Sequence, residues 1–196
     1  MRRPHLASQQ KRIPLGRLQK VYLMTTVARV VLADCEAALV ELRADPQGLQ
    51  WRVRWAAAVA LLRAMLHVLK NIDSLGSPQM RAAIDIKWNE LVNSTPSPAI
   101  FWSFIQRERN NLLKEYRTSA QQSVNIYLPG LELSVSLGGE PPAPVRPTQV
   151  ARCEYSFRMG PGPYEGRDPR DIVAEAIAWL RTYLDEVDAI AARTAP

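Results

Sequence analysis

The chain has 196 residues, enough for one domain with a sizeable core, and its 47% hydrophobic and 22% charged residues are typical of globular proteins. The first 23 residues hold six Lys and Arg and no Asp or Glu, whereas the other 19 Lys and Arg are balanced by 19 Asp and Glu. The net charge of +6 is therefore that of the first 23 residues, and a uniformly basic protein body is excluded. The most apolar run, 55–69, contains Arg63 and His67 and falls short of the roughly 18 residues of a membrane span.

Residues 1–23 form a basic segment that we expect to be flexible. The segment has no apolar stretch of the kind found in secretory signals. Three interpretations remain open: a basic arm that touches phosphates, a solvated leader, or an extension upstream of a true start at Met24, where the periodic sequence begins.

Four helices with short connections are predicted in the first part of the chain. Apolar residues recur every three or four positions from Thr25 to Leu42, where Thr25 or Thr26 is the expected N-cap. The second helix, about 50–72, is apolar nearly all round, which is typical of the middle of a bundle. Ser-Pro pairs at 77–78 and 97–98 open helices that extend to about Val92 and Thr118. This arrangement predicts an antiparallel four-helix bundle over 24–120.

The remainder of the chain, 121–196, changes to a strand pattern. Alternating residues on both sides of Pro129-Gly130 predict a β-hairpin, and a proline-rich connector, Pro141–Pro147, leads to a third strand near Cys153–Phe157. Asp168-Pro169 then opens a long final helix. The predicted fold class is therefore mainly α (α+β): a bundle, then a small three-stranded antiparallel sheet that the last helix covers, all packed as one domain.

Several kinds of site are not indicated. The two cysteines stand in no CxxC pair and have no histidine at ligand spacing, which argues against a disulfide framework or a metal site and suits a reducing cytoplasm. The sequence contains no phosphate-loop spacing, no GxSxG and no repeated acidic pair. We therefore expect no cofactor and no metal, and a cytoplasmic location.

The fourth helix places unusual polar residues among apolar ones. At about 100° per residue, Arg109 falls inside the apolar arc formed by Phe101, Ile105, Leu112 and Tyr116, and Glu108 lies at its edge. A guanidinium directed into a core needs a carboxylate, a carbonyl or a ligand. One interpretation is an internal ion pair with Glu90 or Asp85 of the third helix, and the other is a binding or catalytic site.

The second helix carries one polar strip, made of Arg63, His67, Lys70 and Asn71. Arg63 and His67 are four residues apart and so share a face. Outside the basic segment His67 is the only histidine, so a mechanism that needs an imidazole acid or base would have to use it. The alternative is a structural histidine beside a charged neighbour.

The run Arg109-Asn110-Asn111-Leu112-Leu113-Lys114 resembles a degenerate form of the motif of the HEPN superfamily, helical domains of prokaryotic RNase toxins and defence proteins. The family pattern is an Arg, a polar residue such as Asn, and a His after four to six intervening residues. Arg109 and Asn110 match, and Lys114 stands in place of the His. The resemblance covers about 25–118 and implies a helical bundle that acts on RNA and often pairs its motif helices in a homodimer.

The missing histidine matters for chemistry. A lysine with a reference pKa of about 10.4 transfers protons poorly near neutral pH, although Lys114 could still stabilise phosphate charge. A catalytic site would therefore have to be a composite of Arg63, His67, Glu108 and Arg109, with Asn110, Lys114 and Tyr116 as binding residues.

Three functional hypotheses follow. The first is a non-catalytic HEPN-like domain that binds a protein or nucleic-acid partner, in a phage or defence setting. The second is a metal-independent, toxin-like endoribonuclease that uses the composite site. The third is a structural oligomeric protein in which the polar strip forms an internal network. We expect no membrane association, and a homodimer or protein partner, with RNA as a possible ligand.

Overall fold

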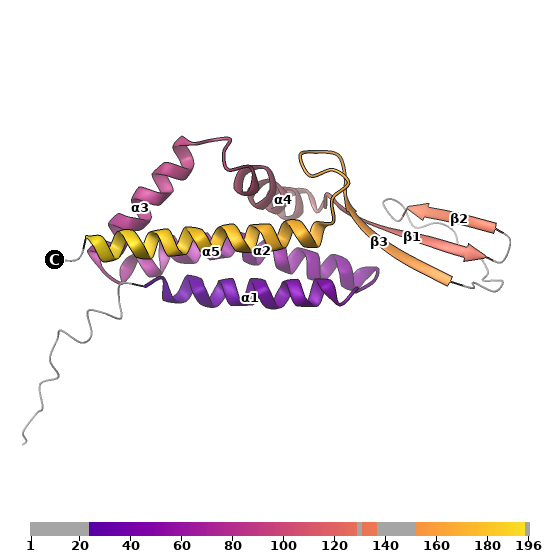
Figure 1. The fold of residues 1–196 in the computed structure, drawn as a ribbon, viewed down its shortest axis with the longest axis horizontal. Helices are drawn as coiled ribbons and strands as arrows, with labels where there is room; N and C mark the ends of the chain where they lie inside the picture. The colour runs from indigo at the N-terminus through magenta and orange to yellow at the C-terminus, as the bar shows by residue number, and fades with distance from the viewer. Residues whose placement is uncertain (1–23, 129–130, 137–151, 195–196) are drawn as a thin grey trace, which may run out of the picture.

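The computed structural model describes residues 24–128, 131–136 and 152–194. The predicted basic segment 1–23, the Pro129-Gly130 turn and the proline-rich connector lie outside the described residues. A mainly α-helical chain with an antiparallel sheet is confirmed, and Figure 1 shows the helices side by side with the sheet beyond one end. The elements in chain order are α1 (Thr26–Arg43), α2 (Leu49–Asn71), η3 (Asp73–Leu75), α3 (Pro78–Asn93), η4 (Ile100–Gln106), α4 (Arg107–Asn110), η5 (Asn111–Glu115), β1 (Ala120–Leu128), β2 (Leu131–Ser136), β3 (Arg152–Met159) and α5 (Pro169–Arg193).

Two helices begin as local sequence rules predict. The Ser77 hydroxyl accepts a hydrogen bond from the Met80 amide at 3.1 Å, and Pro78 occupies the first turn of α3. Asp168 accepts from the Arg170 amide at 2.8 Å and starts α5 in the same way.

The start of α1 is different, because neither Thr25 nor Thr26 caps it with its side chain. The cap is the buried carboxylate of Asp73, from the turn between α2 and α3, which accepts from the amides of Val27 at 3.0 Å and Ala28 at 2.8 Å. Thr25 instead donates its amide and hydroxyl to Asp188 of α5. Capping through a distant residue satisfies the same exposed amides as a local cap does.

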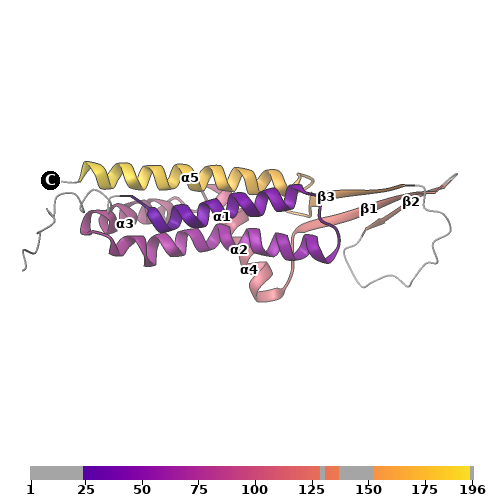
Figure 2. The same cartoon turned by 90° about the horizontal axis from the view of Figure 1, so that it is seen from below.

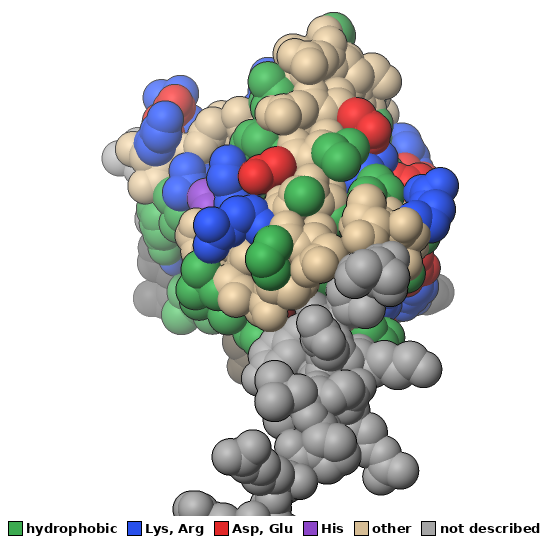
Figure 3. Space-filling model, turned by 90° about the vertical axis from the view of Figure 1, so that its left-hand side faces the viewer, with side chains coloured by type: hydrophobic (Ala, Val, Ile, Leu, Met, Phe, Trp, Pro, Cys, Tyr) green, Lys and Arg blue, Asp and Glu red, His purple; other side chains and the backbone are tan. Residues whose placement is uncertain are grey.

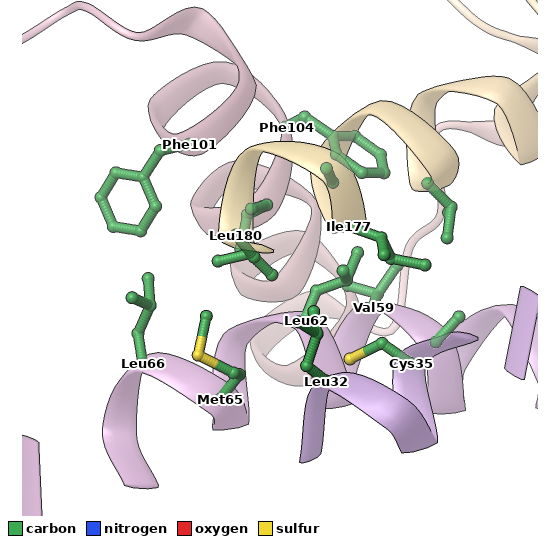
Figure 4. Packing of buried hydrophobic residues seen from close by; sticks show 14 of the residues in the cluster. Leu32, Cys35, Val59, Leu62, Met65, Leu66, Phe101, Phe104, Ile177 and Leu180 are labelled. Atoms are coloured by element: carbon green, nitrogen blue, oxygen red, sulfur yellow. The ribbon is translucent and has the colours of Figure 1, made fainter. Parts of the chain in front are cut away.

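One hydrophobic core lies between α1, α2, α5 and the helical segment 100–115. Figure 4 shows side chains from these four elements pointing toward one another. The core includes Leu32, Cys35, Val59, Leu62, Met65, Leu66, Phe101, Phe104, Ile177 and Leu180. Burial raises the pKa of the Cys35 thiol to about 12, so this cysteine is a neutral packing group.

The prediction that the last helix covers the sheet was wrong. The main neighbours of α5 are α1 and α3, and it is buried along one side from Ile172 to Ala191. Its 25 residues extend over about 37 Å, and the long apolar sides of the other helices match that length better than a small sheet does. Figure 2 shows α5 alongside the other helices, whereas the sheet continues the long axis of the molecule.

The sheet has β1 in the middle, with β2 and β3 antiparallel to it on either side. Val124 of β1 lies opposite Val135 of β2 and Tyr155 of β3. The end near the helices is anchored by Phe157, whose ring lies 4.1 Å from that of Trp51 in α2. At the same end the Gly48 amide donates to Gln122 of β1 at 2.9 Å.

The fourth predicted helix is not a regular α-helix. It consists of the short α4 between two π-helical segments, η4 and η5, and it ends at Glu115 rather than Thr118. A π-helix bonds to the fifth residue along rather than the fourth, so directions calculated at 100° per residue no longer hold through it. Phe101, Ile105 and Leu112 are buried as predicted, but Tyr116 is 73% exposed.

We expect Asp73→Ala to lower the free energy of unfolding by about 2 kcal/mol, because two amides at the start of α1 lose their acceptor in a partly buried place. Asp85→Ala is the control, since this aspartate is exposed and has no hydrogen bond or ion pair to the described residues. Urea unfolding followed by circular dichroism measures both. Equal losses for the two variants would show that the remote cap contributes nothing.

Candidate functional site

Glu108 lies inside the protein, with 3% of its surface exposed, and not at the edge of an apolar face. Its Oε1 accepts three hydrogen bonds: from the Trp55 indole at 3.1 Å, the Ser119 amide at 2.8 Å and the Thr118 hydroxyl at 3.2 Å. These bonds tie α4 to α2 and to the chain that enters β1. Charge-assisted hydrogen bonds offset the cost of burying a carboxylate. Glu108 is therefore explained by a structural role, as the residue that holds these segments together.

A small cavity lies beside Glu108, between the helical segment and the loop that follows β3. Its volume is about 20 Å³, and Phe104, Met159 and Tyr164 are among its lining residues. That is room for about one water molecule and too little for a nucleotide or a metabolite. Glu108 therefore has no substrate-sized space in front of it.

Arg63, His67 and Arg109 are brought together on the side of the molecule formed by α2 and α4. Arg63 is half-buried, and its guanidinium carbon lies 5.7 Å from the centre of the Phe101 ring. Burial, followed by the positive charge of Arg109, lowers the pKa of Arg63. The positive charges of Arg63 and Arg109 repel each other, because no described acidic side chain lies between them. A bound anion would relieve this repulsion.

Arg109 does not form the internal ion pair considered from the sequence. Glu90 pairs with Lys87 at 2.6 Å, and Asp85 has no ion pair with any described residue. Arg109 instead donates from Nη1 to the amide oxygen of its neighbour Asn110 at 2.9 Å. A neutral amide leaves the positive charge uncompensated, and several guanidinium donors remain for another ligand.

His67 is exposed and lies next to both arginines. Burial lowers its pKa, and the positive charges of Arg63 and Arg109 lower it further. The structure therefore joins three of the four predicted catalytic residues, whereas no described interaction links Glu108 to them. The lowered pKa favours the neutral form of the imidazole, and a negative group nearby would shift it back toward the protonated form.

The predicted binding residues continue from this cluster toward the start of α2. Asn110 holds Arg109, and Lys114 is exposed without an acidic partner in the described chain. The ring of Tyr116 lies 5.8 Å from the guanidinium carbon of Arg52. Arg52 was missed from the sequence, although it precedes Arg63 by 11 residues, or three helical turns, and so shares its side of α2.

Charge is distributed unevenly between the two sides of the bundle. Several cations of α1, α3 and α5 are paired with acids, as in Arg29 with Asp188, Arg181 with Glu36 and Lys87 with Glu186. By contrast α2 contains no Asp or Glu, and of its four Arg and Lys residues only Arg54 has a described acidic partner. Figure 3 looks onto the end of the bundle away from the sheet and shows Lys and Arg side chains gathered beside the histidine, with acidic side chains at the border of the group.

Among residues 24–126 and 154–194, whose side chains the structure describes, no group of three or more His, Cys, Asp or Glu side chains could hold a metal ion. The stretch Leu49–Leu75 has the length and mean hydropathy of a membrane span, a property that core helices share. In the structure Trp55, Leu62 and Met65 of this helix are buried in the protein.

Comparison with protein-family models finds no match, and no curated protein or solved structure matches the chain either. The resemblance to the HEPN superfamily therefore remains a prediction.

We expect Glu108→Ala to lower the free energy of unfolding by about 3 kcal/mol, because three donors lose a common charged acceptor inside the protein. Glu108→Gln should cost less, since its amide oxygen can still accept. Chemical denaturation gives the values, with Glu165→Ala as the control at an exposed glutamate. A change for Glu108→Ala no larger than that for the control would rule out the anchoring role.

The His67 imidazole should titrate below the ordinary pKa of 6.5, because burial and two neighbouring positive charges disfavour its protonated form. Arg109→Gln should raise the pKa toward 6.5, whereas Lys114→Gln should change it less. Imidazole proton shifts in NMR measure both, with His67→Gln identifying the signal against that of His5. A wild-type pKa at or above 6.5 would contradict the arrangement.

Proposed function

We propose that this protein is a nucleic-acid-binding helical protein that holds a phosphate backbone at Arg63, His67 and Arg109. The observation that carries the proposal is that two guanidiniums and an imidazole meet without a carboxylate among the described residues. Arginine forks suit phosphate oxygens, and neutralising phosphates accounts for most non-specific affinity for nucleic acids.

The proposal favours binding over catalysis. Acid–base cleavage of RNA needs two groups that exchange protons, and Glu108 is committed to Trp55 and Ser119. His67 alone could accept or donate a proton, and Lys114 occupies the position of the motif histidine. A binding role needs only the positive charge of Arg63 and Arg109 and the hydrogen-bonding capacity of His67.

The HEPN resemblance is compatible with this proposal. In that interpretation residues 24–120 correspond to the family's antiparallel four-helix bundle, and the three-stranded sheet with α5 is an addition to it. Arg109 and Asn110 retain the first two motif positions, and their side chains are hydrogen-bonded to each other. We propose a phage or defence setting on the same resemblance.

The test is binding of fluorescently labelled RNA, followed by anisotropy at several salt concentrations. Residues 1–23 carry six positive charges of their own, so all variants are compared in full-length protein whose six Lys and Arg there are replaced by Gln. We expect the double substitution Arg63→Gln and Arg109→Gln to weaken binding at least tenfold and to reduce the salt dependence by about two phosphate contacts.

The matched control is Arg167→Gln with Arg181→Gln, which removes the same charge from arginines paired with Glu175 and Glu36. This control should bind as the parent does. Equal weakening in both double variants would reduce the effect to net charge and overturn the proposed site. Shortening of the RNA by the parent, lost in His67→Ala, would instead support the endoribonuclease alternative.

A further inference from the structure

Three of the four Arg and Lys residues of α2 lie in one narrow strip with His67, whereas Arg54 is about 200° further around the helix than Arg52. At about 100° per residue, Arg52, Arg63, His67 and Lys70 fall within about 60° of one another around the helix. From Arg52 to Lys70 the strip extends over about 27 Å at the α-helical rise. We name these four residues the α2 strip. Its length exceeds what one phosphate needs and suits a chain of several nucleotides.

Each end of the α2 strip pairs a cation with an aromatic ring. At one end the Arg52 guanidinium carbon lies 5.8 Å from the centre of the Tyr116 ring. At the other end Lys70 Nζ lies 4.8 Å from the centre of the Trp88 ring. Trp88 is half-buried and packs on Phe101, whereas Tyr116 is 73% exposed. Tyr116 is thus the ring that an outside molecule can reach.

Packing does not explain an aromatic residue at position 116. Tyr116 follows η5 in the left-handed backbone conformation, with φ of 53°, which Gly and Asn adopt at lower cost than other residues. Its ring is outside the hydrophobic core. Beside Arg52 an exposed ring of this kind offers a flat surface for another flat group.

Cations in line with an exposed aromatic ring are the arrangement that binds single strands of nucleic acid. Unpaired bases stack on aromatic side chains while the backbone follows a positively charged track. In a duplex the faces of the bases are occupied by their neighbours, so an exposed ring adds little to its binding. An acidic peptide would satisfy the cations but would not need Tyr116.

We propose that the α2 strip and Tyr116 bind single-stranded nucleic acid, with phosphates on the strip and one base stacked on the Tyr116 ring. This inference rests on the proposed function and adds the class of ligand to it. Arg63, His67 and Arg109 supply the central phosphate contacts, and Arg52 holds the Tyr116 ring at the end of the track.

The experiment compares an unstructured 12-nucleotide RNA with the duplex formed from it and its complement, in the full-length background that lacks the six charges of residues 1–23. Binding is measured by anisotropy at one salt concentration. We expect the parent to bind the single strand more tightly than the duplex. Tyr116→Asn removes the ring and suits the backbone, and it should weaken single-strand binding about tenfold or more while changing duplex binding little.

Two control variants accompany Tyr116→Asn. Tyr116→Phe keeps the ring and should bind as the parent does, and Leu113→Ala truncates a neighbouring side chain that is 59% exposed and should also leave binding unchanged. Unaltered single-strand binding by Tyr116→Asn, or duplex binding as tight as single-strand binding, overturns this inference. If Arg63 and Arg109 still matter in that case, the proposed function stands.

A labelled 12-residue poly-glutamate peptide tests the competing class of partner. We expect it to bind more weakly than the single strand and to be insensitive to Tyr116→Asn. If the parent binds the peptide but neither form of RNA, both the proposed function and this inference fail, and an acidic protein partner is favoured.

Discussion

The buried carboxylate of Glu108 is the constraint on which the other features of the site depend. It joins the indole of α2 to the amide at the entry of β1, and so fixes how the helical segment 100–115 lies against both. Consecutive residues of a helix differ in direction by about 100°, so Arg109 does not share the buried position of Glu108 and is half-buried. Arg109 consequently meets Arg63 and His67 rather than the core, and the acid that could have neutralised them is engaged elsewhere.

Local chemistry was predictable from the sequence wherever one or two neighbouring residues decide the outcome. The caps at Ser77 and Asp168, each followed by proline, need no tertiary information. The order of the helices followed from apolar periodicity in the same way. The start of α1 could not be predicted, because its cap comes from Asp73, 45 or more residues further along the chain.

The candidate site was predicted in composition but not in geometry. Arg63, His67 and Arg109 were identified because polar residues stand out on apolar helices. Their directions were calculated for a regular α-helix, whereas π-helical turns change the direction of side chains along the fourth helix. As a result Glu108, and not Arg109, is the buried residue. The long final helix was predicted to pack on the sheet, because a small sheet must bury one of its faces. In the structure α5 packs mainly on the neighbouring helices α1 and α3.

The Asp73 cap also affects how the helices can come apart. Because the first turn of α1 is held by the junction between α2 and α3, those amides have acceptors only while that junction is intact. Thr25 and Arg29 bind Asp188 of α5 at the same place, so three segments distant in sequence meet there. The amino end of a helix usually frays by itself, but fraying of α1 would require the contacts among α1, the turn between α2 and α3, and α5 to break. Hydrogen exchange at Val27 and Ala28 would thus report the cooperative opening of the whole helical part rather than the mobility of one end.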